Sequence, residues 1–275
     1  MEMNEKIQPA WMDETHPNYL RWKRSREISQ ERGKFVVSII EQQIICEGLV
    51  ILDLGSGQGG TADVLSEKNI VISLDLSITR ILNQNTFSNK LFRVNGDALK
   101  VPLRNNSFDL VILQDVIEHV SDPGKIIDKI YSLLKENGVL YLSTPNKYSI
   151  FNIITDPHWG LPFVSLLKRD SIRRYFLKYF RRTEFDRNDI AQLISLSQLI
   201  KIFDNKFGIK LNTKFSVEQL LNGNKGIAWS DFHLNILKFL KRLKIDKPVK
   251  FFANDSAGFI NNFFNPTFYF LLKKK

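Results

Sequence analysis

The chain has 275 residues, of which 43% are hydrophobic, and this is ample for one large domain with a single core. Its one cysteine, Cys46, excludes an internal disulfide framework and is expected to be a small buried core residue. The charged N-terminus lacks an apolar signal segment, and no apolar run is long enough to cross a bilayer, so we expect a cytoplasmic protein.

The net charge of +10 is concentrated in late segments of the chain. Residues 168–187 and 238–250 each carry a net charge of +5, and Lys273, Lys274 and Lys275 add +3, which leaves −3 for the remainder. Segments of this kind are typical of contact with nucleic acid or with an anionic membrane surface. Abundant Lys, Asn and Ile also follow from genome composition, so the basic charge alone assigns no partner.

Strand and helix patterns alternate from residue 33 to about residue 145, as a parallel sheet with crossover helices requires. The predicted strands are 49–54, 70–76, 90–94, 108–114 and 138–143, and the predicted helices between them are 61–68, 78–85 and 124–137. The last helix has clear boundary signals, because it starts after Asp122-Pro123 and ends at Asn137-Gly138.

The alternation of strand and helix patterns becomes less regular after residue 145. A helix is predicted at 196–207 and a strand at 208–215. We expect one domain over residues 1–275. Its predicted parts are a cofactor-binding core at 33–145, an insertion forming an acceptor lid at 146–194, a helix and strand at 195–216, a second insertion at 217–261, and a final strand at 265–273. Pro266 lies near the start of this strand, where its missing N–H is tolerated.

The stretch ILDLGSGQGG, residues 51–60, places glycines at the G-x-G-x-x-G spacing after a strand, where the backbone of a loop can approach a ligand closely. Asp53 stands at the end of that strand, and its carboxylate would repel a pyrophosphate but attract a cationic ligand. S-adenosylmethionine is such a ligand, because its ammonium and sulfonium groups are positive. Asp75 ends the next strand, where its carboxylate could accept hydrogen bonds from the ribose hydroxyls of a dinucleotide or of S-adenosylmethionine.

The stretch from Asp53 to Asn146 resembles the class I S-adenosylmethionine-dependent methyltransferases, in particular the type 11/23-like group that includes quinone-biosynthesis O-methyltransferases. The motifs that carry the resemblance are, in chain order, DLGSGQGG, SLDLS, NGDALKVPLRNNSFDLVILQDVIEHV and GVLYLSTPN. The resemblance implies an α/β fold with a Rossmann-like seven-stranded sheet, mostly parallel with an antiparallel last strand. Helices would cover both faces, with helical insertions after strands 5 and 6.

The resemblance also implies S-adenosyl-L-methionine as the cofactor, and it assigns the residues that hold it. Leu76 would lie beside the adenine, Asp97 would meet its amino group and Ala98 its ring, and Gln114 would flank the methionine part. The full set of implied cofactor-binding residues is Asp53, Gly55, Ser56, Gly57, Gly59, Asp75, Leu76, Asp97, Ala98 and Gln114.

Each acid in this set has a structural alternative. Asp53 could stabilise the loop or cap a helix, Asp75 could cap the helix at 78–85, and Asp97 could form a turn after Gly96. Their joint position favours the cofactor interpretation, because all three lie at the carboxyl edge of a parallel sheet, where open α/β folds bind ligands.

His119 is the first candidate for a general base. Asp115, Glu118 and His119 follow the fourth strand, and a helix beginning there would place them on one face. Some quinone-type relatives use a matching acid–acid–His set for a divalent metal, but Asp115 departs from their usual glutamate. We therefore assign no metal site. The alternative is that Glu118 and His119 stabilise the loop and helix around the cofactor, and His119 is a candidate base under either interpretation.

The segment after the fifth strand supplies His158, the second candidate base, and Trp159, a flat binding surface. A structural corner with a packed tryptophan is the alternative. The adjoining FVSLLKRDSIRRYFLKYFRR, residues 163–182, mixes large apolar residues with Arg and Lys at helical spacing. It could be a core helix with a solvated face or a surface for anionic lipid or a phosphorylated acceptor.

Together these features predict an S-adenosylmethionine-dependent methyltransferase that acts on a hydroxyl of a small-molecule, glycan or lipid-linked acceptor. Peripheral membrane contact through the basic insertions is a further expectation. The alternatives are an RNA methyltransferase, supported by the basic insertions alone, a non-catalytic cofactor-binding partner subunit, and an NAD-dependent oxidoreductase, which Asp53 disfavours.

Overall fold

The computed structural model describes residues 14–15, 19–84, 88–185, 189–227 and 231–275. The charged N-terminal segment 1–13, the last residue of the predicted helix 78–85, and residues 186–188 and 228–230 of the two predicted insertions lie outside the described residues.

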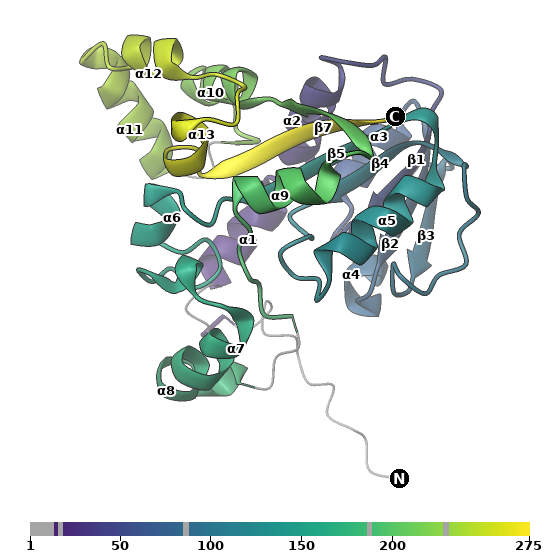
Figure 1. The fold of residues 1–275 in the computed structure, drawn as a ribbon, viewed down its shortest axis with the longest axis horizontal. Helices are drawn as coiled ribbons and strands as arrows, with labels where there is room; N and C mark the ends of the chain where they lie inside the picture. Colours follow the sequence, from purple (N-terminus) through teal and green to yellow (C-terminus); the bar gives the residue numbers. More distant parts are fainter. Residues whose placement is uncertain (1–13, 16–18, 85–87, 186–188, 228–230) are drawn as a thin grey trace.

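A seven-stranded sheet forms the centre of the molecule, with the strand order β3-β2-β1-β4-β5-β7-β6 (Figure 1). The last strand, β7, runs antiparallel to both β5 and β6, and the other neighbours are parallel. This confirms the predicted mostly parallel sheet with an antiparallel last strand. The strands are β1 (Val50–Leu54), β2 (Ile70–Asp75), β3 (Leu91–Asn95), β4 (Phe108–Gln114), β5 (Leu134–Pro145), β6 (Phe207–Leu211) and β7 (Thr267–Lys274).

Helices cover both faces of the sheet and form a separate group at one end (Figure 1). The α-helices of the core are α1 (Tyr19–Glu27), α2 (Ser29–Ile40), α3 (Gly60–Ser66), α4 (Ile78–Leu82), α5 (Pro123–Leu133), α9 (Leu196–Phe203) and α10 (Thr213–Leu221). The others are α6 (Ile150–Ile154), η2 (Val164–Leu166), α7 (Arg169–Ser171), η3 (Ile172–Leu177), α8 (Lys178–Phe180), η4 (Arg182–Glu184), α11 (Asp231–Arg242), α12 (Asp246–Phe252) and α13 (Phe259–Phe263).

Successive side chains along the strands point to opposite faces of the sheet, and each face has its own hydrophobic cluster. On one face, Leu52 and Leu140 pack with α5 and α9. On the other, Ile51 and Tyr141 pack with α2 and α3, and the buried free thiol of Cys46 joins this cluster, as predicted. Among the described residues, no helix is both long enough and apolar enough to span a membrane.

The structure corrects the ends of several predicted elements. The helix predicted at 196–207 ends at Phe203, and Phe207 is already the first residue of β6. The helix predicted at 124–137 ends at Leu133, because Leu134 is extended and pairs with Phe108 as the first residue of β5. The strand predicted at 208–215 ends at Leu211, where the backbone N–H of Asn212 donates to the Tyr269 carbonyl and α10 begins one residue later. Apart from its undescribed residues, the second predicted insertion, 217–261, contains the end of α10, all of α11 and α12, and the start of α13.

Helices α2 and α3 approach closely at two glycines. A Cβ atom on Gly33 would lie 2.8 Å from the Gly60 carbonyl oxygen, and one on Gly60 would lie 2.5 Å from the Ser29 Cβ. Both contacts are shorter than real Cβ atoms allow. This contact brings α2 beside the glycine-rich loop that precedes α3.

We predict that Gly33→Ala destabilises the fold by roughly 1 to 3 kcal/mol, because the added methyl group must displace backbone atoms of α3. Thermal unfolding measures the effect. Gly208→Ala is the matched control, since a Cβ at this position would lie 3.8 Å from the Lys273 carbonyl oxygen, an ordinary van der Waals contact. Equal melting temperatures for the two variants would mean that the helices do not pack as described.

Candidate active site

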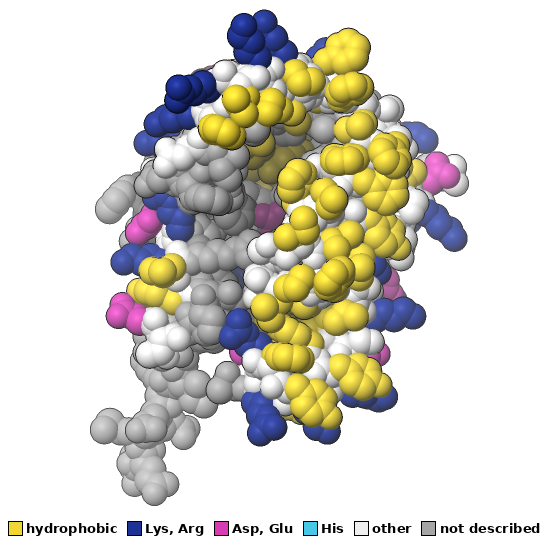
Figure 2. Space-filling model, turned by 90° about the vertical axis from the view of Figure 1, so that its left-hand side faces the viewer, with side chains coloured by type: hydrophobic (Ala, Val, Ile, Leu, Met, Phe, Trp, Pro, Cys, Tyr) yellow, Lys and Arg dark blue, Asp and Glu magenta, His cyan; other side chains and the backbone are white. Residues whose placement is uncertain are grey.

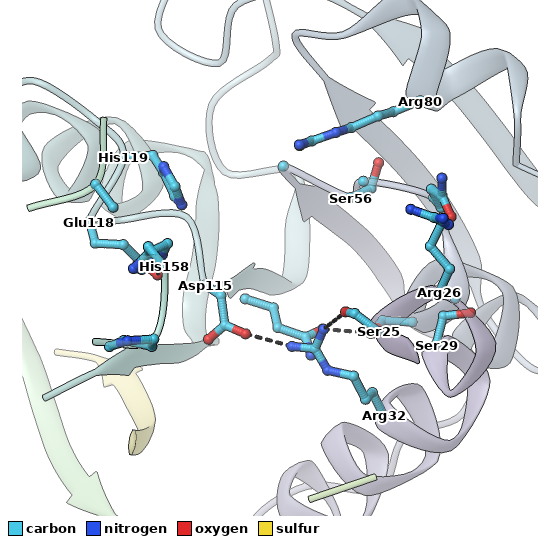
Figure 3. A pocket seen from close by; sticks show the side chains of 18 of the residues that line it. Ser25, Arg26, Ser29, Arg32, Ser56, Arg80, Asp115, Glu118, His119 and His158 are labelled. Atoms are coloured by element: carbon cyan, nitrogen blue, oxygen red, sulfur yellow. Dashed lines mark hydrogen bonds and ion pairs between the residues drawn. The ribbon is translucent and has the colours of Figure 1, made fainter. Parts of the chain in front are cut away.

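A pocket of about 550 Å³ opens at the carboxyl ends of β1 and β4 (Figure 3). The strand order reverses between these two strands, and such switch points are where open α/β sheets bind ligands. The predicted site residues that line this pocket are Asp53, Gly55, Ser56, Gly57, Gln114, His119 and His158.

The glycine-rich loop forms one wall of the pocket, and its backbone requires glycine. Gly55, Gly57 and Gly59 have φ angles of 77°, 56° and 79°, in the left-handed region that other residues rarely adopt. A Cβ on Gly55 would overlap Val116 Cγ2 at 2.4 Å, whereas one on Gly57 would meet no atom within 4 Å. The loop is thus tightly packed behind Gly55 and open toward a ligand at Gly57.

Asp75 holds this loop in place. Its Oδ2 accepts a hydrogen bond from the Gly57 N–H (2.9 Å), and its Oδ1 accepts one from the Ser77 N–H (2.8 Å). The helix cap of α4 is the Ser77 side chain, which accepts from the Arg80 N–H, so the alternative role of Asp75 as that cap is wrong. Asp75 is 4% exposed and does not line the pocket, so its contact with a ribose stays a prediction.

Asp53 is the most unusual group of the pocket wall. Its side chain is 2% exposed, and its Oδ2 has no hydrogen-bond partner among the described residues. Burial, followed by the negative charge of Asp75, raises the pKa of Asp53 to about 7. A buried carboxylate in this state would be stabilised by a positively charged ligand group.

Side-chain hydrogen bonds fix two more of the predicted residues. Thr61 Oγ1 donates to Gln114 Oε1 (2.7 Å), which ties the end of β4 to the start of α3. Ser56 Oγ accepts from Ser73 Oγ (2.7 Å) and from Gln84 Nε2 (3.0 Å). The pocket wall is therefore held in one arrangement before any ligand enters.

Besides Asp75, four predicted cofactor residues do not line the pocket. Leu76 is 74% exposed, Asp97 Oδ1 accepts from the Leu99 N–H in a turn, Ala98 packs against the core, and Gly59 lies at the start of α3. Their proposed contacts with the adenine or the methionine part stay predictions.

No helix begins directly after β4, where one would have placed Asp115, Glu118 and His119 on one face. Asp115 has a φ of 53°, a left-handed conformation that Asp tolerates but a helix does not, and a turn follows. Its carboxylate forms an ion pair with Arg32 and accepts a hydrogen bond from Ser143. The Asp115 carboxylate is therefore bound to Arg32 and Ser143 rather than to Glu118 or His119. The three residues do not share one helical face.

Glu118 instead meets His158, which comes from the segment after α6 (Figure 3). His158 Nε2 lies 3.8 Å from Glu118 Oε1, and Thr144 Oγ1 donates to Glu118 Oε2 (2.9 Å). Glu118 is 1% exposed, and burial, then the charge of Asp115, raises its pKa to about 8.

His119 completes the cluster. Its ring centroid lies 5.1 Å from that of His158 at an interplanar angle of 80°, and its Nδ1 lies 3.0 Å from the Asp189 carbonyl oxygen. The donor atoms of Glu118, His119 and His158 all lie within 4.8 Å of one another, so these three side chains could hold a metal ion. His158 thus takes the place in the cluster that the sequence suggested for Asp115.

Arg169 joins the first insertion to the turn after β4. Its guanidinium donates to the carbonyl oxygens of Glu118, Val120 and Ile190 at 2.8 to 3.0 Å. Trp159 is 3% exposed and packs 5.4 Å from the Phe176 ring, so it forms the packed corner while still lining the pocket.

Helices α1 and α2 contribute pocket residues that the sequence analysis missed. Ser25, Arg26, Ser29 and Arg32 line the pocket, and Arg32 donates to Ser25 Oγ (3.1 Å) as well as to Asp115 (Figure 3). No local signal distinguishes these side chains from an ordinary charged helix face.

Comparisons with known proteins agree with this geometry. The sequence profile of the methyltransferase domain family matches residues 52–142, which run from β1 into β5. A ubiquinone biosynthesis O-methyltransferase from Coxiella burnetii is 30% identical over 113 residues, covering 39% of this chain and 48% of that protein. An S-adenosylmethionine-dependent methyltransferase structure from Mesorhizobium loti superposes with a TM-score of 0.54 at 13% identity, covering 86% and 96% of the two chains. Residues 52–142 therefore match the methyltransferase domain family, and the chain has the fold of S-adenosylmethionine-dependent methyltransferases.

The chain spans about half the length of the curated relatives it matches. A probable S-adenosylmethionine-dependent methyltransferase from Mycolicibacterium smegmatis is 29% identical over 103 residues, which are 37% of this chain and 40% of that protein. The cofactor of the family is S-adenosylmethionine. The site fits this cofactor, because Asp53 Oδ2 lacks a hydrogen-bond partner among the described residues and Gly57 leaves open space in the wall.

We predict that Asp53→Asn makes the cofactor-free methyltransferase more stable at pH 8, by on the order of 1 to 4 kcal/mol, while weakening its affinity for S-adenosylmethionine. In the folded protein the pKa of Asp53 is raised from 3.8 to about 7. The wild type is therefore destabilised progressively as the pH rises through that window, and the full penalty is present above it.

Denaturant unfolding at pH 5 and pH 8 measures this effect. The free energy of unfolding of Asp53→Asn should exceed that of the wild type by more at pH 8 than at pH 5. A variant that is less stable than the wild type at pH 8 would show that the Asp53 carboxylate is satisfied within the protein.

Proposed function

We propose that the protein transfers the methyl group of S-adenosylmethionine to a hydroxyl of a small-molecule, glycan or lipid-linked acceptor. The observation that carries this proposal is the cluster of Glu118, His119 and His158, which shares one pocket with the glycine-rich loop (Figure 3). A hydroxyl acceptor must lose its proton, and this cluster provides groups that can take it. The Coxiella relative named above is described as an O-methyltransferase, which agrees with this acceptor class.

His158 acts as the proton acceptor in this proposal. S-adenosylmethionine, when bound, supplies a methyl group whose bond to sulfur breaks as the acceptor oxygen bonds to the methyl carbon, and the electron pair leaves on sulfur. The imidazole of His158 takes the hydroxyl proton. In its ionised form Glu118, whose Oε1 lies 3.8 Å from Nε2, stabilises the imidazolium that results, so this support increases as the pH rises through the Glu118 pKa of about 8.

His119 is held in a single tautomer beside this pair. A carbonyl oxygen only accepts hydrogen bonds, so the contact with Asp189 requires the proton of the neutral ring on Nδ1. Its Nε2 then carries a lone pair. His119 is thus a second group that can accept a proton or orient the acceptor oxygen.

The first insertion serves as the acceptor wall and lid. Its Pro157, His158 and Trp159 line the pocket, and Arg169 fastens it to the turn that carries Glu118. The acceptor would lie between this wall and the glycine-rich loop, which would align its oxygen with the methyl carbon.

We predict that Glu118→Gln and His158→Ala each lower methyl transfer by roughly 10²- to 10⁴-fold, with cofactor affinity changed by less than about threefold. The assay incubates the protein with methyl-labelled S-adenosylmethionine and a cell extract, then fractionates the label into RNA, protein, lipid, glycan and small molecules. Calorimetry measures cofactor affinity separately.

The matched control is Glu67→Gln, which makes the same chemical change at an exposed residue outside the pocket. Label in RNA would support the RNA methyltransferase alternative. Tight cofactor binding with no labelled product in any fraction would support the non-catalytic subunit. Unchanged methyl transfer by Glu118→Gln and His158→Ala would contradict the proposal that His158 accepts the hydroxyl proton.

A further inference from the structure

One end of the molecule exposes an unusual number of large apolar side chains. They lie on α6, the segment between α6 and η2, α8, α11, α12 and α13, and Figure 2 shows them spread over one face with Lys and Arg at its margins. Prominent members, with exposed fractions of 57% to 83%, are Phe151, Phe163, Phe180, Phe251 and Phe259. We call this surface the apolar face.

Buried amides connect the two central helices of the apolar face. Asn152 Nδ2 donates to the Pro266 carbonyl oxygen (2.7 Å), beside α13, and Asn146 Nδ2 donates to the carbonyl oxygens of Asn262 (2.9 Å) and Asn265 (2.8 Å). Asn152 Nδ2 also donates to the Asn146 carbonyl oxygen (2.8 Å), so α6 and α13 are both attached to Asn146 after β5, at the same end of the molecule (Figure 1). The aromatic rings therefore project from a fixed scaffold.

Phe163, on the apolar face, has an unusual backbone conformation. Its φ of 65° lies in the left-handed region, which is strained for a bulky residue, yet its side chain is 66% exposed. Strain of this kind persists when the surrounding structure imposes it, and it clusters at functional sites. Here it turns an aromatic ring outward at a position where glycine would fit without strain.

Basic side chains accompany the apolar face. A groove of about 640 Å³ beside α7 and α8 is lined by Arg173, Arg174, Lys178 and Arg182, with Asp170 as its acid and Phe185 as its aromatic residue. Residues 238–250, at the end of α11 and in α12, add a net charge of +5. Exposed aromatic side chains with basic margins are typical of protein surfaces that lie in a membrane interface.

We propose that the apolar face docks the protein onto an anionic phospholipid bilayer. The phenylalanine rings would enter the acyl boundary while Arg and Lys contact lipid phosphates. A second copy of this chain fits less well, because two such positive margins would repel each other. A nucleic acid would neutralise the cations but leave the apolar side chains exposed to water.

Docking in this way would also bring the active site to the lipid. Pro157 and His158, which line the pocket, come from the same segment between α6 and η2 as Phe163. A lipid-linked acceptor could then reach the pocket without leaving the membrane. This last step rests on the proposed function, whereas docking itself does not.

Sedimentation with vesicles tests the docking directly. The full chain should bind vesicles of phosphatidylcholine with phosphatidylglycerol, and binding should weaken as salt rises, since exposed charges are screened. Vesicles of phosphatidylcholine alone should bind it much less. Because neither cofactor nor acceptor is present, the result is independent of methyl transfer.

Matched variants locate the binding surface. Phe251→Ser and Phe259→Ser should each lower vesicle affinity by roughly tenfold, the effect expected for a buried phenylalanine side chain. Phe92→Ser, at a 54% exposed residue of β3 on the opposite edge of the sheet, should leave it unchanged. Phe163→Gly should weaken binding while keeping or raising the melting temperature, because it relieves the left-handed strain.

Three results would overturn the proposal. The first is equal vesicle binding by the wild type, Phe251→Ser and Phe259→Ser. The second is binding that does not depend on anionic lipid. The third is a dimer in sedimentation velocity that Phe259→Ser dissociates, which would assign the face to a second copy.

Discussion

The arrangement of the active site follows from two carboxylates, Asp53 and Asp75, at the ends of neighbouring parallel strands. Both are almost fully buried, and the charge of Asp75 helps raise the pKa of Asp53. The backbone N–H of Gly57 satisfies Asp75, and the left-handed glycines give the loop the shape that this bond needs. Asp53 keeps an oxygen without a partner among the described residues, so binding of a cation is the natural way to lower its energy.

The opposite wall of the pocket depends on contacts between distant segments. Glu118 follows β4, whereas His158 and Arg169 belong to the insertion after β5. Arg169 spans the two by donating to carbonyl oxygens on both, and this holds His158 beside Glu118. The proposed cofactor wall is thus built from strand ends and the glycine-rich loop. The proposed catalytic wall combines the turn after β4 with an insertion that Arg169 attaches to it. This division would allow the acceptor to change while the cofactor site stays the same.

Local patterns predicted the sheet and the glycine-rich loop because both are encoded within short stretches. Short apolar runs marked the strands, and Asp53, two residues before Gly55, marked the ligand loop. The Glu118–His158 pair was not predictable, because it joins residues 40 positions apart and depends on a turn at Asp115 that the helical spacing concealed. The basic segment 163–182 suggested a surface for anionic lipid, but the aromatic face beside it emerges only when α6 and α13 come together.

Proton release on cofactor binding tests the central claim most directly. If Asp53 has a pKa of about 7 in the free protein and ionises beside a cationic ligand, then binding S-adenosylmethionine near pH 6 must release close to one proton. Titration calorimetry in buffers of different ionisation enthalpy counts this proton. We expect a buffer-dependent binding enthalpy for the wild type that disappears in Asp53→Asn. A wild-type enthalpy that is the same in all buffers at pH 6 would contradict the account.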